Sequence, residues 1–534
     1  MTPPVITAEG PPLLRIAGIT KHFGSLIAND NISFDLNRGE VLALLGENGA
    51  GKSTLVSILF GHYRADAGIV EVDGRQLPPG DTQAALRAGI GMVHQHFTLA
   101  DNLSVLDNVL IGAEPLWLPF TRRAQARTRL LETSRRYGLQ VDPDALVGEL
   151  SVGERQRVEI LKVLVPIGRR GGARLLILDE PTAVLTPQES QSLFATLKQL
   201  VAQGLAVIFI SHKLDEVLGV AQRIAVLRGG RLVAQLPAAG ATKAQLAQAM
   251  VGQSVPQPAR RTQLAAPDVV CSLKDVTVRG RGARPLLDRV NLDLRAGEVV
   301  AVAGVAGNGQ QALADLLHGL IAPDAGQLTV DGVVLPARPR AWLRAGVARI
   351  PEDRQAAGVV GDLPLWENAV LERHADAPFA RRGIVQRGAA RAFAERVVKR
   401  FDVRGTEAAG VGTITRALSG GNMQKLILGR ALLGDPRDPK PPLLIVADQP
   451  TWGLDIGALA YVHQQLLDAC AQGAAVLLIS EDLDEIFAIA DRLAVIHAGR
   501  LSATRPVADW SLAAIGLTMA GAPAHDAVGA AHAP

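Results

Sequence analysis

The residues of this chain with the clearest chemistry lie in the stretch GENGAGKST, Gly46–Thr54. It has the form G-x-x-x-x-G-K-[ST] and stands between a predicted strand and a predicted helix. Glycines let successive backbone amides point at phosphate groups, and the helix dipole favours the same negative charge. A glycine-rich turn without a ligand is the alternative, but the flanking strand and helix favour a phosphate site. Its residues are Gly46, Glu47, Asn48, Gly49, Ala50, Gly51, Lys52, Ser53 and Thr54.

Two carboxylates, Asp179 and Glu180, end the apolar segment LLILDE. At the carboxyl edge of a parallel sheet, where ligand crevices form, they would lie near the phosphate loop. Lys52 would then supply charge to the β- and γ-phosphates of a nucleotide, while Ser53 and Asp179 could bind Mg²⁺, the latter through water. Glu180 is placed to orient or deprotonate the attacking water. An acidic pair at a strand end is often only a solvated turn, so this hypothesis depends on the neighbouring phosphate loop.

The elements that must position these groups occur twice. The segment NISFDLNRGEV at Asn31 is matched by RVNLDLRAGEV at Arg289. LSVGERQR at Leu150 is matched by LSGGNMQK at Leu418, LLILDEPTAVLT by LLIVADQPTWGLD, and AVIFISHKLDEV by AVLLISEDLDEI. Landmarks in the same order at similar spacing indicate a duplication.

Within each half, apolar segments alternate with helical ones. Continuous apolar runs such as 41–45, 175–178 and 206–210 predict an α/β fold with a parallel sheet covered on both faces. Asp101–Gly148 is mainly helix-like and predicts a helical subdomain.

The join between the halves is the polar, proline-containing stretch GQSVPQPARRTQLAAPD. We therefore predict a first domain over 11–252, a linker over 253–267 and a second domain over 268–520. The alanine- and glycine-rich residues 521–534 predict a flexible tail.

The amino-acid composition limits which classes of protein this chain can belong to. The chain has 534 residues, 48% hydrophobic and 20% charged, which predicts a globular protein. Its net charge of +3, from 55 basic and 52 acidic residues, gives no reason to expect a nucleic-acid partner. Cys271 and Cys470 are expected to be free thiols in a reducing compartment. We expect neither a signal peptide nor a direct membrane span, because no apolar run approaches the roughly 20 residues a spanning helix needs.

Together these motifs resemble the ATP-binding-cassette ATPases over nearly the whole chain. Gly46–Thr54 resembles the Walker A loop, Leu175–Glu180 the Walker B strand and Leu150–Glu154 the family signature. The resemblance implies two tandem P-loop NTPase domains. Each would have a RecA-like parallel-sheet core, an antiparallel β subdomain and a helical subdomain. It also implies ATP and Mg²⁺ as cofactors.

The resemblance assigns roles to three further residues. His212 is similar to the switch histidine that contacts the γ-phosphate, and Gln95 in MVHQHF to the Q-loop glutamine that links Mg²⁺ to the transport partner. Phe23 in ITKHFG is similar to the aromatic residue that stacks on adenine, and the alternative for it is a place in the core. His94 and His96 flank Gln95, and a surface loop explains them better than a metal site.

The second half lacks most of this chemistry. Its loop GVAGNGQQ keeps Gly304 and Gly309 but has Gln310 and Gln311 in place of lysine and serine. A lost charge-assisted contact costs about 1.5–3 kcal/mol, which weakens nucleotide binding about ten- to a hundredfold. No aromatic residue replaces the one that stacks on adenine. The second site is therefore predicted not to hydrolyse ATP, and its other substituted positions are Glu352 for the Q-loop glutamine, Gln449 for the catalytic glutamate and Glu481 for the switch histidine.

For the signature motif the comparison is reversed, because here the second half is intact and the first half is altered. LSGGN in the second half is intact, as is Asp455, whereas the first half has Val152 in place of a glycine and Thr186 in place of an aspartate. In the family two cassettes pair head to tail, so that each ATP lies between one Walker A loop and the other signature. The resemblance thus implies one working site, made by the Lys52 loop and the second signature, and one dead site. The signature residues predicted to bind nucleotide are Ser419, Gly420, Gly421 and Asn422.

Two cassettes in one chain, the sequence IPEDR and a degenerate second half resemble importer ATPases for simple sugars and nucleosides. GMVHQHFTLADNLSVLDNVLIG and DLPLWENAVL are more similar to the nucleoside type than to the ribose type. The resemblance implies two transmembrane permease subunits, an extracytoplasmic solute-binding protein and a peripheral place on the cytoplasmic face of the inner membrane. Motion would reach the permease through Gln95–Glu114 and Glu352–Glu367. Glu114–Phe120, EPLWLPF, belongs either to that docking surface or to the core of the subdomain.

The alternative from another class is a soluble two-cassette protein that acts on ribosomes or in DNA repair. Translation factors of this kind carry a long charged linker and two competent sites, whereas this chain has a short linker and one competent site. A purely regulatory ATP-binding module would need Glu180 or His212 to be idle, and nothing in the sequence indicates that.

Overall fold

The computed structural model describes residues 11–24, 26–94, 97–112, 122–166, 172–182, 187–211, 213–252, 268–280, 282, 284–305, 307–407, 409–434, 441–519 and 521. The chain divides into two compact units, Met1–Val255 and Pro256–Pro534. The predicted linker over 253–267, and residues 522–534 of the predicted tail, lie outside the described residues.

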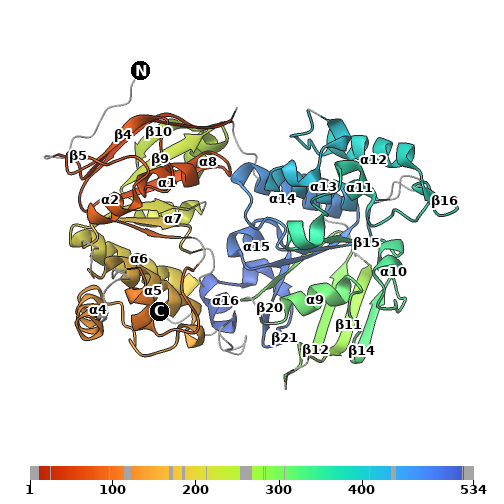
Figure 1. Cartoon of the computed structure of the whole chain (residues 1–534). Coiled ribbons are helices and arrows are strands. Elements are labelled where there is room, and N and C mark those ends of the chain that lie inside the picture. Colours follow the sequence, from red (N-terminus) through yellow and green to blue (C-terminus); the bar gives the residue numbers. More distant parts are fainter. Residues whose placement is uncertain are drawn as a thin grey trace. The chain divides into compact units, whose positions relative to one another are not determined.

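The first unit is built on two sheets (Figure 1). The larger has the strand order β10-β9-β3-β8-β7-β6, parallel except for β10 at one edge. Its strands are β3 (Val41–Gly46), β6 (Ile90–Val93), β7 (Leu175–Asp179), β8 (Ala206–Ile210), β9 (Arg223–Arg228) and β10 (Arg231–Pro237). The smaller sheet is antiparallel, with the order β2-β1-β4-β5, and consists of β1 (Leu14–Phe23), β2 (Leu26–Leu36), β4 (Ala67–Val72) and β5 (Arg75–Gln76).

The apolar runs of the first unit form strands because the sheet is covered on both faces. Every residue of β3 and β8 is buried, as expected for strands that have no solvent face. One hydrophobic cluster joins Ile16 of the antiparallel sheet, Leu55 of the helix after β3, and Leu42 and Ile208 of the parallel sheet. The helices of this core are α1 (Lys52–Leu59), α2 (Thr82–Arg87), α6 (Pro187–Ala202), α7 (Leu214–Val220) and α8 (Lys243–Val251).

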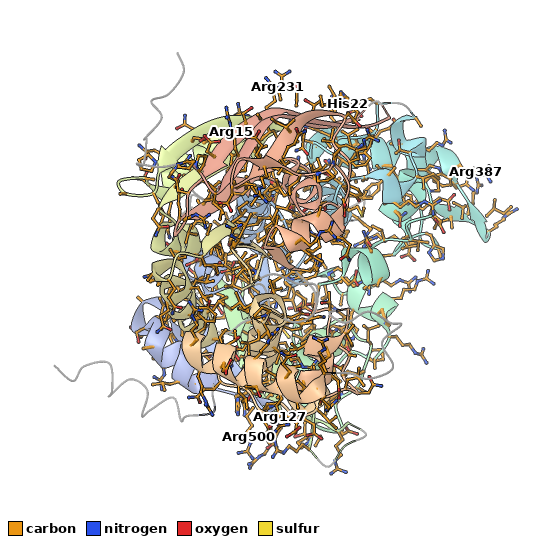
Figure 2. All side chains as sticks on the ribbon, turned by 60° about the vertical axis from the view of Figure 1, so that its left-hand side comes forward. Arg15, His22, Arg127, Arg231, Arg387 and Arg500 are labelled. Carbon is orange, nitrogen blue, oxygen red and sulfur yellow. The ribbon has the colours of Figure 1, made fainter. Side chains whose placement is uncertain are left out.

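A helical group lies on the side of the first unit away from β4 and β5 (Figure 1). It contains α3 (Val105–Leu110), α4 (Arg123–Tyr137), η1 (Val147–Glu149) and α5 (Val152–Leu164). Arginines of α4 are paired with carboxylates: Arg127 (Figure 2) lies 2.6 Å from the Asp144 carboxylate, and Arg123 pairs with Asp107. The helical subdomain predicted for 101–148 is therefore confirmed over the described residues.

The second unit repeats this plan. Its parallel sheet has the order β15-β18-β19-β13-β20, with β21 and β22 antiparallel to β20, and its antiparallel sheet has the order β12-β11-β14. The strands of the larger sheet are β13 (Val299–Ala303), β15 (Val347–Ile350), β18 (Leu444–Asp448), β19 (Ala475–Ser480), β20 (Arg492–His497), β21 (Arg500–Leu501) and β22 (Arg505–Pro506). Those of the smaller sheet are β11 (Val269–Val278), β12 (Leu287–Arg295) and β14 (Ala325–Val330).

Helices complete the second unit. Those of the core are α9 (Gln310–Leu317), α10 (Pro339–Arg344), α14 (Ile456–Ala471), α15 (Leu483–Ile489), η5 (Val507–Asp509) and α16 (Leu512–Met519). The helical group consists of η2 (Arg354–Gly358), α11 (Leu365–Val370), α12 (Arg387–Arg400), η3 (Gly410–Gly412), η4 (Thr415–Ala417) and α13 (Gly420–Leu432), with a hairpin of β16 (Ala380–Arg381) and β17 (Ile384–Val385). Figure 1 shows α11, α12 and α13 at the other side of this unit from β11, β12 and β14.

The duplication extends to unusual backbone angles. Asn31 and Arg289 have φ of +50° and +49°, Asp73 and Asp331 both have +49°, and Glu180 and Gln449 have +47° and +46°. Left-handed angles are uncommon for residues other than glycine, so their recurrence at matched positions shows that both copies keep the same local backbone. The predicted fold class, two tandem P-loop NTPase domains with parallel-sheet cores, antiparallel sheets and helical subdomains, is confirmed.

Charged groups tie the helical group of the second unit to its parallel sheet. Glu372, after α11, accepts a hydrogen bond of 2.6 Å from Arg349 on β15 and lies 3.4 Å from Arg430 on α13. Arg430 is buried and also donates to the carbonyl oxygens of Asn368 and Gly358. Burial alone would raise the pKa of Glu372, but the charges of Arg430 and Arg349 lower it below its ordinary value.

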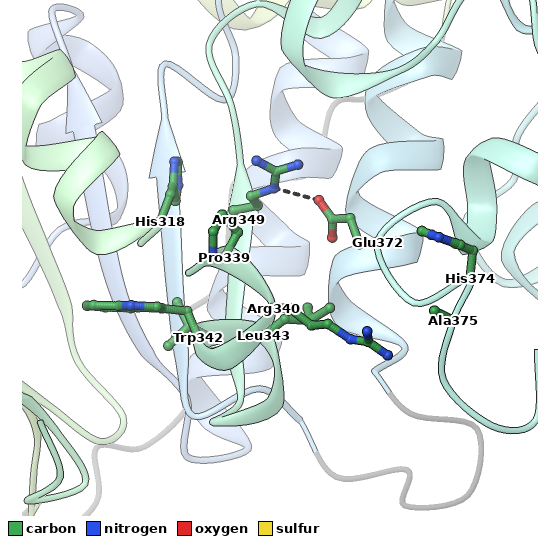
Figure 3. A pocket seen from close by; sticks show the side chains of 10 residues that line it. His318, Pro339, Arg340, Trp342, Leu343, Arg349, Glu372, His374 and Ala375 are labelled. Atoms are coloured by element: carbon green, nitrogen blue, oxygen red, sulfur yellow. Dashed lines mark hydrogen bonds and ion pairs between the residues drawn. The ribbon is translucent and has the colours of Figure 1, made fainter. Parts of the chain in front are cut away.

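A cavity of about 260 Å³ lies beside this network (Figure 3). Trp342 and His318 stand on one side of it and His374 on the other, with the Arg349–Glu372 pair between them. Burial and the charge of Arg349 lower the pKa of His318 to about 4, so its imidazole is neutral at pH 7. The arginines next to the cavity are paired with carboxylates, which gives it no excess positive charge for a phosphate. It is lined by His318, Pro339, Arg340, Trp342, Leu343, Val347, Arg349, Glu372, His374 and Ala375.

We predict that Glu372→Gln lowers the free energy of unfolding of the second unit by about 3–5 kcal/mol, because it leaves the buried Arg430 and the partly buried Arg349 without a carboxylate. The measurement is urea unfolding followed by tryptophan fluorescence, which reports mainly on this unit because Trp342, Trp366, Trp452 and Trp510 are four of the five tryptophans. Asp376→Asn is the matched control. Asp376 pairs with the exposed Arg340 and Arg344, so its loss should cost at most about 1 kcal/mol. Equal costs for the two variants would show that the buried network does not stabilise the unit.

Candidate functional site

The backbone of the first loop requires glycine at two positions. Gly46 ends β3 with φ of +155°, and Gly51 precedes α1 with φ of +98°. A Cβ atom would lie 2.4 Å from the Leu227 carbonyl oxygen at the first position and 2.2 Å from the Ala28 carbonyl oxygen at the second. Both contacts are with backbone, which cannot move aside. The loop over 47–51 therefore holds a tight path from the strand into the amino end of α1, as a phosphate cradle needs.

A buried asparagine also fixes this loop. Asn29 in β2 is fully buried, and its side-chain Nδ2 donates to the Gly51 carbonyl oxygen at 3.0 Å. The matched residue of the second half is Leu287, which cannot make this bond. Asn29 is not among the site residues predicted from the sequence. The sequence does carry a signal for it: a polar residue, Asn29, stands inside a strand, and the matching residue in the second half, Leu287, is apolar.

The ammonium group of Lys52 is held on the inner side of the loop. Lys52 is only 9% exposed, and its Nζ donates to the carbonyl oxygens of Gly46 at 2.7 Å and Glu47 at 3.0 Å. Ser53, the next residue of α1, is exposed. The charge is thus fixed before any ligand arrives, which is the arrangement that favours transition-state stabilisation.

The predicted acidic pair lies within electrostatic range of this lysine. Burial and the neighbouring charge of Glu180 raise the pKa of Asp179, at the end of β7, to about 6, while Lys52 acts in the opposite direction. Glu180 follows the strand in a left-handed conformation, and its backbone N–H donates to Ile210 of β8 at 2.9 Å. A half-buried carboxylate next to a second acid fits a divalent cation, which would favour the ionised form. The structure thus brings Lys52, Asp179 and Glu180 together.

Phe23 is on the surface. Its side chain is 44% exposed, so the alternative that placed it in the core is wrong. Its ring makes an edge-to-face contact with Tyr63 at 5.5 Å between ring centres, and Lys21 Nζ lies 5.4 Å from its centre. Tyr63 is equally exposed, and nothing in its sequence context pointed to this pair. An exposed aromatic ring is free to stack on a planar ligand, and stacking on adenine stays a prediction.

The two signature helices begin differently. Ser151 caps α5 in a full capping box with Glu154, whose pKa is lowered by hydrogen bonds from the backbone and side chain of Ser151. A carboxylate therefore already sits at the positive end of this helix. Val152, at the first helical position, is 40% exposed. This helix start has little to offer to a second anion.

The start of α13 carries no such carboxylate. Ser419 caps it and accepts a 2.9 Å hydrogen bond from the side chain of Asn422, a neutral residue at the position that corresponds to Glu154. Ser419 and Gly420 are exposed, and a Cβ on Gly420 would meet only Arg354, at 3.9 Å. The positive end of a thirteen-residue helix is therefore free to receive an anion. The intact second signature was predicted from the sequence, but this difference in charge between the two helix ends was not.

The second loop is closed by its own side chains. Gln310, at the position of Lys52, is buried; its Nε2 donates to the Val305 carbonyl oxygen at 2.8 Å and its Oε1 accepts from the Asn308 N–H at 3.1 Å. Gln311, at the position of Ser53, donates to Asp315 at 3.0 Å. The carboxamide of Gln310 thus replaces the tethered ammonium and brings no charge.

Carboxylates dominate the rest of the second site. Burial and the charges of Glu352, Asp315 and Glu481 raise the pKa of Asp448, at the end of β18, to about 7. Gln449 keeps the left-handed backbone of Glu180 and has a neutral side chain, whose Oε1 accepts from the Glu481 N–H at 3.4 Å. Lys52 offsets the acids of the first site, whereas the charges that shift the pKa of Asp448 are all negative. A phosphate would meet repulsion here.

Several predicted residues lie outside the described part of the chain. They are Gln95 and His96, the switch histidine His212, Thr186 after the Walker B strand, and 114–120. Their roles stay predictions. The two units are described separately, so the Ser419 signature and the Lys52 loop are each placed only within their own unit. Neither Cys271 nor Cys470 forms a disulfide, as predicted, and both are buried.

Comparison with known proteins identifies the class of protein. The family model described as ABC transporter matches residues 29–183 and again residues 287–451. Together the two matches cover more than half of the chain. The chain therefore belongs to the ABC transporter family, with two ATP-binding cassettes in tandem, and the resemblance drawn from its motifs is confirmed.

The curated proteins that this chain is similar to are ATP-binding proteins of importers. The chain is 41% identical to the glucose import ATP-binding protein of Haloferax volcanii over 96% of each chain. It is 41% identical to the nucleoside import ATP-binding protein of Lactococcus lactis subsp. cremoris, over 92% of this chain and 94% of the relative. It is 39% identical to the guanosine import ATP-binding protein of Bacillus subtilis, over 95% and 97%.

A solved structure shares the two-cassette fold. It is the complex of the archaeal ribosomal stalk protein with the archaeal ribosome recycling factor. The match covers 92% of this chain and 90% of the chain in that structure, with a TM-score of 0.59 and 18% sequence identity. At that identity the likeness concerns the fold alone.

We predict that binding of Mg²⁺ with a non-hydrolysable ATP analogue releases a proton at Asp179 below about pH 6. The pKa of about 6 means that this carboxyl is protonated in the free protein below that pH, and a bound cation needs it ionised. Affinity should therefore fall about tenfold per pH unit below pH 6 and level off above it. Calorimetry at about pH 5 and about pH 7, about one unit to either side of the transition, in buffers of different ionisation enthalpy measures the release.

Two variants separate the sites in this measurement. Asp179→Asn should abolish the proton release, whereas Asp448→Asn, at the matched position of the second unit, should leave it unchanged. Release that persists in Asp179→Asn would place the titrating group elsewhere.

Proposed function

We propose that this chain binds and hydrolyses ATP to drive a multi-subunit importer of nucleosides or simple sugars, with one competent ATP site and one degenerate site. The observation that carries the asymmetry is the charge of the two sheet edges. In the first unit the Lys52 ammonium opposes Asp179 and Glu180. In the second the neutral Gln310 stands at the lysine position, and three carboxylates act on Asp448.

At the competent site the loop amides and Lys52 bind the β- and γ-phosphates of ATP, and Phe23 stacks on the adenine. Mg²⁺, when bound, supplies positive charge that offsets the phosphates, and Ser53, Gln95 and Asp179 would hold it. Glu180 orients the attacking water and accepts its proton, and His212 contacts the γ-phosphate. The half-buried position of Asp179 and the fixed ammonium of Lys52 support these roles.

The competent site is completed by the signature of the second half. In this arrangement the two halves pair head to tail, and Ser419, Gly420, Gly421 and Asn422 face the γ-phosphate held by the Lys52 loop. The exposed amino end of α13, which carries no carboxylate, supports the pairing. The amino end of α5, with Glu154 in its capping box, would face the degenerate loop at Gly304.

The chain works as a peripheral subunit on the cytoplasmic face of the membrane. Two transmembrane permease subunits and an extracytoplasmic solute-binding protein complete the importer. Within the residues that the structure describes, no helix combines the length and apolar character of a membrane span. Relatives named for nucleoside, guanosine, glucose and ribose import support the substrate class, and the sequence favours nucleosides.

We predict that Lys52→Ala and Glu180→Gln abolish ATP hydrolysis. The first variant weakens nucleotide binding about ten- to a hundredfold, and the second removes a general base worth about 10²–10⁴ in rate. Gln310→Ala and Gln449→Ala, at the matched positions of the second unit, should leave hydrolysis within about twofold. The measurement is phosphate release by the complex with its permease subunits. Normal turnover in either first-unit variant would overturn the site assignment.

The same variants test import. In cells that lack the gene, the wild-type chain and Gln310→Ala should restore uptake of labelled nucleosides or ribose, and Lys52→Ala should not. Unchanged uptake of every sugar and nucleoside in the deleted cells, together with altered polysome profiles, would favour the ribosomal alternative.

We predict that Ser419→Arg reduces hydrolysis by at least about a hundredfold, because a bulky cation would occupy the place of the γ-phosphate next to the helix end. Ser151→Arg is the control. It removes an equivalent helix cap, worth about 1 kcal/mol, but from the signature that faces the degenerate loop. Hydrolysis by Ser151→Arg should stay near the wild-type rate. Equal losses in both variants would contradict head-to-tail pairing with a single competent site.

A further inference from the structure

A basic hairpin stands at the outer edge of the second unit. β16 and β17 pair as Ala380↔Val385 and Arg381↔Ile384, so that Arg382 and Gly383 form a two-residue turn. Arg382 has φ of +50°, a conformation in which such turns favour asparagine, aspartate or glycine. Figure 1 shows β16 at the margin of the α11–α12 group. We define the hairpin surface as Arg381, Arg382, Ile384, Val385, Arg387 and Arg391.

The arginines of the hairpin surface are exposed, and the described residues provide no carboxylate partner for them. In the described part of the chain, no acidic group lies within ion-pair distance of Arg381, Arg382 or Arg387. Figure 2 shows Arg387 reaching outward from the edge of the ribbon. Further along α12 the exposed side adds Arg396, Lys399 and Arg400, against a single acid, Glu395. Among the described residues, therefore, no ion pair balances the positive charge of the hairpin surface.

The first unit provides an internal comparison. Its helix α4 follows α3 as α12 follows α11, and it is also rich in arginine. There Arg123 pairs with Asp107, Arg127 with Asp144 at 2.6 Å, and Arg136 donates to Gln203 at 2.9 Å. The repeat shows that this fold can pair such arginines with its own side chains. Glu367 stands in α11 at the position of Asp107, but among the described residues neither Arg387 nor Arg391 of α12 forms an ion pair with it.

Apolar side chains occupy the same tip. Ile384 is 69% exposed and Val385 is 41% exposed, next to the arginines in the hairpin. Cations around exposed aliphatic groups form the pattern of a segment that rests in a membrane interface. Binding to nucleic acid gains from exposed aromatic rings, and the hairpin surface has none.

We propose that the hairpin surface docks on anionic phospholipid at the membrane. The arginines contact lipid phosphates, and Ile384 and Val385 enter the boundary between head groups and acyl chains. The proposal rests on the proposed function only in that an importer subunit works next to a membrane. Each arginine near an anionic surface strengthens binding about fivefold, so three contribute about a hundredfold.

The test is sedimentation of the purified full chain with vesicles of phosphatidylcholine and phosphatidylglycerol, and with vesicles of phosphatidylcholine alone. We expect binding to the first kind only, weakened when salt rises from about 0.05 M to about 0.5 M. The triple variant R381Q/R382Q/R387Q should bind about a hundredfold more weakly. I384S/V385S should bind more weakly at both salt concentrations. The control R127Q/R129Q/R136Q removes three charges from α4 and should bind as the wild type does.

Several outcomes would overturn the proposal. The first is equal binding to both kinds of vesicle. The second is an equal loss of vesicle binding in R381Q/R382Q/R387Q and in R127Q/R129Q/R136Q. The third is binding to heparin or tRNA without binding to vesicles. The last outcome would indicate a soluble polyanion as the partner. ATP hydrolysis in the absence of vesicles should be unchanged in all three variants. Failure of vesicle binding with normal hydrolysis would leave the proposed function intact.

Discussion

The buried ammonium of Lys52 is the interaction on which the first site depends. It is held by two carbonyl oxygens of its own loop and lies within electrostatic range of the acids at the end of β7. A charge in this position needs a loop that bends tightly, a strand that ends beside it, and a helix that begins with the lysine itself. The glycines at Gly46 and Gly51 and the parallel order of β3, β8 and β7 meet these needs.

The second unit shows that this backbone does not require the charge. Gln310 replaces the lysine and hydrogen-bonds to its loop through both ends of its carboxamide, and the strand, loop and helix keep their places. Gln449 likewise keeps the left-handed backbone of Glu180. Because fold and charge are held by different groups, the second copy could lose its chemistry while it kept its architecture. Its carboxylates around Asp448 then make the sheet edge unfavourable for phosphate.

The same separation of shape and charge recurs in the helical groups. The α5 and α13 helices both begin with a serine cap, but only α5 carries a carboxylate at its positive end. The α4 and α12 helices both follow a short helix, but only α4 pairs its arginines internally. In each comparison the copies share hydrogen bonds and apolar packing, which determine the fold, and differ in surface charge, which determines what each copy can bind.

Sequence by itself determined the duplication, the α/β class, the strands at 41–45, 175–178 and 206–210, and the residue types of both loops. These follow from local patterns: apolar runs, glycine spacing and capping residues act over a few positions. Only the tertiary structure decided how charge is balanced, because that depends on groups brought together from distant parts of the chain. The raised pKa of Asp179, the exposed ring of Phe23 and the bond from Asn29 to Gly51 are of this kind. So is the pairing of Glu372 with Arg349 and Arg430, since burial sets its energy and no local pattern encodes burial by a neighbouring element.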